Sequence, residues 1–171
     1  MPPVDLRKRK GHLLITDRHA GYVHHTLVEL GYLKSVQSPT SDSATFNVRL
    51  HITGQILIGS SRQYGAEATS VESEILSPEP GRAQQYMAGL GELSTIHTWT
   101  AFRAATPDRV SYIGPGWEDQ TTFLATRHEG LGIATAPGTG LLVAGQLRPL
   151  ESRIPIEPCL PARIAAERIH A

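Results

Sequence analysis

The sequence predicts an α+β fold, with a mixed, largely antiparallel sheet, flanking helices, and a strand, glycine turn and helix near the C-terminus. Residues 44–52 alternate apolar and polar side chains, and residues 56–60 return after a turn at 53–55, which is typical of a β-hairpin. Residues 93–103 are strand-like because they are rich in Thr, Ile, Trp and Phe. Residues 122–147 combine a short apolar strand, closely spaced glycines and an apolar helix.

The other elements are predicted from shorter signals. Residues 11–16 form an apolar run that indicates a buried strand, and the basic cluster 7–10 beside it is expected to be a solvated edge. Residues 22–33 favour an extended segment. A helix is expected to begin at Ser70, with acidic residues in its first turn. Prolines then break that helix before a second helical piece over 80–90.

The composition is that of an ordinary globular chain of about one domain. Of its 171 residues, 40% are hydrophobic and 19% are charged, and 16 Lys and Arg balance 16 Asp and Glu. With no net charge, no global field favours nucleic acid. Cys159 is the single cysteine, and no apolar run is long enough for a signal peptide or a membrane span. We therefore expect a soluble, cytoplasmic chain. The histidine spacing lacks a metal-ligand pattern, so no metal site is expected.

The glycine turn at Gly130 and Gly132 is the first candidate site. Its glycines permit a sharp turn, and the free N–H groups of the following helix favour an anion or the electron-rich edge of a cofactor. Tight packing between a strand and a helix is the alternative explanation. The run Gly130-x-Gly132-x-x-Thr135 lacks the third glycine or alanine of a dinucleotide fingerprint, and no convincing second strand precedes Glu151. A complete Rossmann domain is therefore expected to be absent.

Two charged or titratable side chains lie near these elements. His128 would need a carboxylate partner to act as a base, but the adjacent Glu129 is expected to point elsewhere, which favours a local hydrogen bond. Arg103 ends a strand-like run, where its guanidinium either clamps a carboxylate with two hydrogen bonds or makes a structural ion pair. No catalytic residue is assigned from the sequence.

Several segments, taken in order, resemble the C-terminal signature of the glycine oxidase/D-amino-acid oxidase family of FAD-dependent oxidoreductases. The segments are Arg103-Ala-Ala-Thr106-Pro107-Asp108, Ile113-Gly114, residues 125–133 with His128-Glu129-Gly130-Leu131-Gly132-Ile133, and Ala136-Pro-Gly-Thr-Gly140. Upstream, residues 9–12 and 54–63 resemble the family's entry into its substrate domain and a strand after a hairpin turn. The resemblance covers roughly residues 7 to 160.

The resemblance implies a substrate domain of the D-amino-acid oxidase type and particular site residues. Gly130, Leu131, Gly132 and Ile133 would bind the flavin edge, and Arg103 would hold the substrate carboxylate. The implied reaction on amines or amino acids is hydride transfer from the C–N carbon to the flavin of FAD. At Arg127 the chain departs from the family, which usually has glycine there. An arginine close to the flavin would either overlap it or point away.

The resemblance covers a second half, because the family's N-terminal strand and Gly-x-Gly-x-x-Gly turn are absent from the sequence. The FAD site is thus expected to be incomplete in this chain alone, and to need an N-terminal FAD-binding half or subunit; homo-oligomerisation is the other association expected. The alternative function is a non-catalytic remnant or protein-binding subunit that retains the substrate-domain fold. The expected divisions are 1–117, substrate-domain-like; 118–150, the flavin-edge strand, turn and helix; and 151–171, a proline-rich tail.

Overall fold

The computed structural model describes residues 7–31, 43–59, 61–116, 120–148 and 152–163. These residues belong to two compact units, one comprising Lys8–Phe102 and the other comprising Arg7 and the residues from Arg103 onward, so the last three residues of strand β6 (Thr95–Ala105) belong to the second unit. The expected divisions near residues 117 and 150 fall on residues outside the described part, and they stay a prediction.

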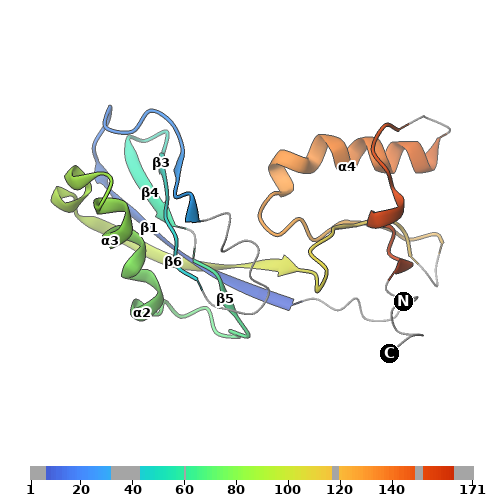
Figure 1. Ribbon diagram of the computed structural model, residues 1–171, viewed down its shortest axis with the longest axis horizontal. Helices are drawn as coiled ribbons and strands as arrows, with labels where there is room; N and C mark the ends of the chain where they lie inside the picture. Colours follow the sequence, from blue (N-terminus) through green and yellow to red (C-terminus); the bar gives the residue numbers. More distant parts are fainter. Residues whose placement is uncertain (1–6, 32–42, 60, 117–119, 149–151, 164–171) are drawn as a thin grey trace. The chain divides into compact units, whose positions relative to one another are not determined.

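The first unit is built on a six-stranded sheet in the order β2-β3-β4-β1-β5, with β6 also paired to β1 (Figure 1). The pairs β1–β4, β1–β5, β2–β3 and β3–β4 are antiparallel, as the sequence predicts. Short helices lie beside the sheet. The elements are β1 (Arg7–Arg18), β2 (Leu27–Val28), β3 (Asn47–Leu50), β4 (Gln55–Gly59), β5 (Gln63–Tyr64), α2 (Ser73–Leu76), α3 (Pro78–Gln84), the 3₁₀ helix η1 (Ala88–Glu92) and β6 (Thr95–Ala105).

The core of this unit forms where the helices cover one face of the sheet. Apolar side chains from β1, β3 and β4 pack against residues of α2, α3 and η1, and all of the members are buried. Alternation explains the sheet contribution, because every second residue of a strand points to the same face. The cluster consists of Leu14, Val23, Phe46, Val48, Ile56, Ile58, Leu76, Ala83 and Leu90.

The hairpin prediction is confirmed, since β3 pairs with β4 from Asn47↔Gly59 to Leu50↔Ile56. In the structure, however, the buried apolar face of this hairpin is shorter than the alternating sequence pattern predicts. Phe46 and Val48 are buried, whereas Ile52 lies in the turn and is 97% exposed. Side chains in a turn beyond the helices have no layer to pack against, so the periodic pattern continues past the core.

The basic cluster is not wholly a solvated edge, because Arg9 and Lys10 are buried. The Lys10 ammonium donates to Glu72 at 2.6 Å, and the Arg9 guanidinium lies 4.7 Å from the centre of the Tyr64 ring. Buried cations need such partners. The helix expected to begin at Ser70 begins later, as α2 at Ser73, without a side-chain N-cap.

The second unit contains a two-stranded antiparallel sheet and the longest helix that the structure describes. Strand β7 (Tyr112–Pro115) pairs with β8 (Phe123–Thr126), and α4 (Gly132–Leu147) follows β8 after a glycine turn. The 3₁₀ helix η2 (Glu157–Cys159) lies in the tail. The strand, turn and helix expected over 122–147 are thereby confirmed.

Candidate functional site

The glycine turn between β8 and α4 has an unusual backbone. Arg127 (φ 73°), Glu129 (φ 48°) and Gly130 (φ 107°) all have positive φ angles. Non-glycine residues rarely adopt such conformations, and each costs of the order of 1–3 kcal/mol unless surrounding contacts hold it. The chain therefore uses strained backbone to lead from β8 into the helix.

Helix α4 begins directly after this turn and leaves its first N–H groups without a side-chain cap. Leu131 occupies the N-cap position, and its N–H donates to the carbonyl of His128 at 2.7 Å. The first bond along the helix runs from the Thr135 N–H to the Leu131 carbonyl at 2.9 Å. The N–H groups of the opening turn therefore point outward with the positive end of the helix dipole.

Arg103 reaches this turn, although 27 positions separate it from Gly130 in the sequence. A Cβ atom built on Gly130 would lie 3.3 Å from Cδ and 3.4 Å from Nε of Arg103. Glycine therefore lets the arginine side chain lie directly on the turn backbone. The structure brings together the two predicted parts of the site, the cation of β6 and the glycines before α4.

The other predicted residues occupy the N-cap and the first positions of the helix, where Leu131 and Ile133 are exposed and Gly132 is half-buried. A Cβ atom on Gly132 would meet only the Cβ of His128, at 3.7 Å. Leu131 is 59% exposed and Ile133 is 96% exposed. Gly130, Leu131, Gly132 and Ile133 thus form an open, largely apolar surface next to the Arg103 side chain.

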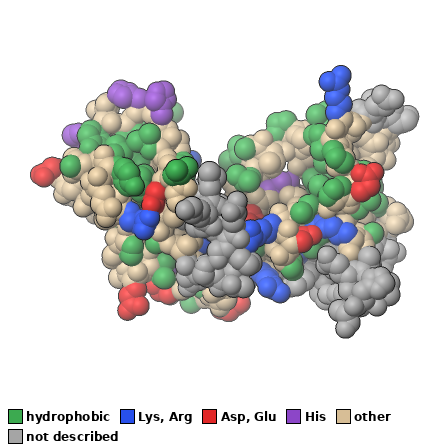
Figure 2. Space-filling model, in the orientation of Figure 1, with side chains coloured by type: hydrophobic (Ala, Val, Ile, Leu, Met, Phe, Trp, Pro, Cys, Tyr) green, Lys and Arg blue, Asp and Glu red, His purple; other side chains and the backbone are tan. Residues whose placement is uncertain are grey.

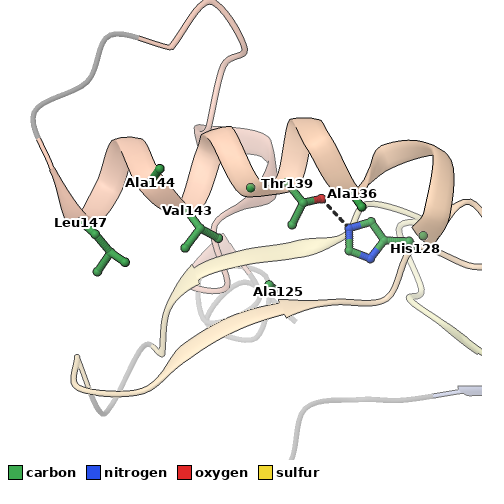
Figure 3. Close-up of a pocket in the computed structure, with 9 residues that line it drawn as sticks. Ala125, His128, Ala136, Thr139, Val143, Ala144 and Leu147 are labelled. Carbon is green, nitrogen blue, oxygen red and sulfur yellow. Dashed lines mark hydrogen bonds between the residues drawn. The ribbon is translucent and has the colours of Figure 1, made fainter.

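His128 bonds within the unit, as the sequence analysis favours. Its Nε2 atom lies 2.8 Å from the Thr139 hydroxyl oxygen, which is two turns into α4. Figure 3 shows this pair at one end of a groove between α4 and the strands, with Val143 further along. The groove has a volume of about 610 Å³ and is lined mainly by small and apolar residues, including Ala125, Ala136, Gly140 and Leu147.

Arg127 does not extend from the turn into solvent. Its side chain is 3% exposed, and its guanidinium carbon lies 4.5 Å from the centre of the Tyr112 ring. A cation over an aromatic face is favourable, so this contact stabilises the buried position of the Arg127 side chain.

Asp108, in the Thr-Pro-Asp turn, binds Arg163 of the tail, a contact that the sequence analysis did not predict. Burial raises the pKa of Asp108, but hydrogen bonds from Arg163 and from the Val110 N–H outweigh it and lower that pKa below its usual value. The two partners are 55 positions apart, and the proline-rich tail carries no motif that signals the contact.

The comparisons with known proteins agree with this fold. The family model for FAD-dependent oxidoreductases named DAO matches residues 1–146. The chain belongs to this family. No curated protein sequence matches the chain.

Several solved structures share the fold at low sequence identity. Glycine oxidase from Geobacillus kaustophilus matches with a TM-score of 0.73 and 20% identity, over 94% of this chain and 40% of its own. L-proline dehydrogenase from P. horikoshii matches with a TM-score of 0.78 and 20% identity, over 96% and 42%. Iminodiacetate oxidase from Chelativorans sp. BNC1 matches with a TM-score of 0.74 and 15% identity, over 93% and 40%. The chain thus spans about two fifths of the length of these proteins.

No helix among the described residues combines the length and apolar character needed to cross a membrane.

Proposed function

We propose that this chain supplies the carboxylate-binding arginine and the flavin-edge turn of an FAD-dependent oxidoreductase that acts on amines or amino acids. The observation that carries the proposal is the contact between Arg103 and Gly130, which places Cδ and Nε of the arginine against the turn that precedes α4. Membership of the FAD-dependent family supports it. The structurally similar enzymes are named for glycine, L-proline and iminodiacetate, which are all amines that carry a carboxylate.

The residues present fit the ring edge of the cofactor. Gly130 and Gly132 leave the turn without side chains, and the N–H groups of the first helical turn favour an electron-rich edge. The Arg103 guanidinium offers two parallel hydrogen bonds to a substrate carboxylate and so orients the C–N carbon. When bound, the flavin supplies the hydride acceptor.

The nucleotide portion of FAD needs a further half, because the sequence contains no complete Gly-x-Gly-x-x-Gly run. The surface of α4 supports this part of the proposal. The helix has no charged residue, and Ile133, Leu141 and Leu147 are exposed on it. Figure 2 shows hydrophobic side chains on this part of the surface. An apolar surface of this kind marks an interaction site. We assign it to an FAD-binding half, on this or another chain.

Co-purification tests this function. The chain is prepared alone and together with an FAD-binding half encoded by a neighbouring reading frame, and bound flavin is measured by its visible absorbance. We expect flavin in the joint preparation and little in the chain alone. Absence of flavin from every preparation in which both halves co-purify would exclude the enzyme function. Tight FAD binding by the chain alone would contradict the need for a second half.

A non-catalytic protein-binding subunit is the second candidate, and the exposed apolar side chains of α4 favour it equally. The two candidates differ in what the complex binds. A stable complex with no flavin, in which Leu141→Asp on α4 abolishes association, would support the binding subunit. Leu50→Asp, at a half-exposed position in the other unit, is the control and should leave association unchanged.

A further inference from the structure

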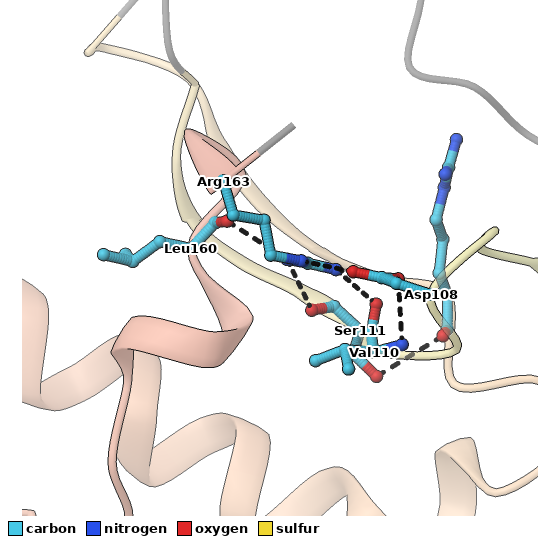
Figure 4. A network of polar contacts seen from close by, with 6 residues as sticks. Asp108, Val110, Ser111, Leu160 and Arg163 are labelled. Atoms are coloured by element: carbon cyan, nitrogen blue, oxygen red, sulfur yellow. Dashed lines mark hydrogen bonds and ion pairs between the residues drawn. The ribbon is translucent and has the colours of Figure 1, made fainter. Parts of the chain in front are cut away.

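Arg163 lies in the tail, outside residues 1–146. Its side chain forms hydrogen bonds with the segment that joins the Thr-Pro-Asp turn to strand β7. Its Nε donates to Asp108 Oδ2 at 2.6 Å and its Nη2 to Asp108 Oδ1 at 3.3 Å. The same guanidinium donates to three carbonyls, those of Val110 at 2.6 Å, Ser111 at 3.3 Å and Leu160 at 3.1 Å (Figure 4). These contacts use the whole planar fork, which a lysine does not possess.

The residues just before Arg163 pack on the same strand. A Cβ atom on Gly114 of β7 would lie 3.0 Å from Cδ2 of Leu160 and 3.3 Å from Cδ of Pro161. Pro161 is fully buried, and the Arg163 guanidinium carbon lies 4.2 Å from the centre of the Tyr112 ring. The tail therefore fixes β7 by apolar packing as well as by hydrogen bonds.

Strand β7 in turn holds the first residue of the strained turn. The Tyr112 ring that contacts the Arg163 guanidinium also contacts that of Arg127, whose guanidinium carbon lies 4.5 Å from the ring centre. The Ser111 hydroxyl donates to the Arg127 carbonyl at 3.3 Å, and Tyr112 is the strand partner of Thr126. Contacts thus run without interruption from the tail arginine to the residue at which the turn begins.

We propose that Arg163 is a positioning residue for the turn over residues 127–131, and through it for the contact between Gly130 and Arg103. The physical reason is the strain in this turn, since residues with positive φ keep that conformation only where their surroundings determine it. Loss of the tail contacts lets Arg127 relax, and the backbone on which Arg103 lies moves with it. The part of this proposal that concerns substrate rests on the proposed function, whereas the mechanical coupling does not.

Amide hydrogen exchange on the full 171-residue chain tests the coupling. Arg163→Met removes the fork but keeps an aliphatic stem, and Arg153→Met is the control, because Arg153 lies exposed in the same tail. We expect the amides of residues 127–131 to exchange at least about tenfold faster in Arg163→Met than in the wild type, because local opening becomes easier. Exchange in β1 should stay unchanged, and Arg153→Met should match the wild type.

Two milder variants test the same contact in case Arg163→Met prevents folding. Asp108→Asn keeps the shape of the partner but removes its charge, and Arg163→Lys keeps the charge without the fork. Both should accelerate exchange in the turn less than Arg163→Met does. The proposal is overturned if exchange of residues 127–131 is unchanged in all three variants. Equal acceleration across β7, β8, α4 and the turn would also overturn it, because the tail would then only stabilise the unit.

A kinetic measurement adds a readout that a purely structural tail would not change. In a flavin-containing complex, Arg163→Met should raise KM for a carboxylate-bearing amine several-fold more than it lowers kcat, since Arg103 rests on the displaced turn. If no complex binds flavin, the proposed function fails while the exchange experiment still decides the role of Arg163.

Discussion

Replacing Gly130 with alanine tests the packing of Arg103 on the glycine turn. Two costs follow from the structure. The φ angle of +107° lies in a region that side-chain-bearing residues rarely adopt, and the new methyl group would lie 3.3 Å from Cδ of Arg103. Backbone strain of this kind costs about 1–3 kcal/mol, and the arginine side chain can move away from the methyl group. We therefore expect Gly130→Ala to lower the free energy of unfolding by about 1–3 kcal/mol.

Urea unfolding followed by circular dichroism measures this change, and Gly140→Ala is the matched control. Gly140 lies within α4, and a Cβ atom there meets nothing within 4 Å. Alanine at this position should stabilise the chain by about 0.5–1 kcal/mol, because glycine is the poorer helix former. A Gly130→Ala variant that is as stable as the wild type, or more stable, would contradict this expectation.

Two further predictions concern the first unit. Burial, and next the charge of Lys10, lower the pKa of His12 below its ordinary value of 6.5. Folding therefore favours the neutral form of His12. Its contribution to stability is complete above about pH 6.5 and falls as the pH drops below that value. The reason is that the unfolded chain takes up the proton at a higher pH than the folded chain does. His12→Gln should flatten this part of the profile of unfolding free energy against pH, and an unchanged slope would contradict the assignment. Arg82→Met should destabilise the unit by about 1–3 kcal/mol, because it leaves the buried Glu29 carboxylate without the hydrogen bond at 2.9 Å from Arg82 Nε. Thermal unfolding measures this loss, and Glu29→Gln in the Arg82→Met background should recover part of it.

Local sequence patterns predicted the parts of the fold that depend on neighbouring residues. The hairpin of β3 and β4 follows from alternation around a glycine turn, and the order of β8, turn and α4 follows from an apolar run, two glycines and a second apolar run. The first residues of the helices were predicted less accurately. Ser70 has the chemistry of an N-cap, but α2 begins where the Glu72 N–H donates to His12 on β1, at 3.2 Å.

Contacts between distant positions were not predictable from local patterns. The local sequence predicts a surface charge at Lys10, but the fold brings Glu72, 62 positions away, to its ammonium. Arg163 lies in a segment where prolines obscure any periodicity, and its partner Asp108 belongs to a different element. For the candidate site, composition and spacing indicated only a glycine turn and a strand-end arginine. The family resemblance linked them, and the structure brings Arg103 into contact with Gly130, whereas the roles of both residues stay a prediction.

Flavin reduction by paired substrates tests whether Arg103 binds the substrate carboxylate. In the anaerobic flavin-containing complex, the rate of bleaching is compared for a small amino acid and for the corresponding amine without its carboxylate, in the wild type and in Arg103→Ala. We expect Arg103→Ala to slow bleaching by the amino acid greatly at low concentration and to leave the flavin content unchanged. We expect little change in the rate of bleaching by the amine. An equal loss for both substrates, or no loss for the amino acid, would contradict the assignment of Arg103 as the carboxylate-binding residue.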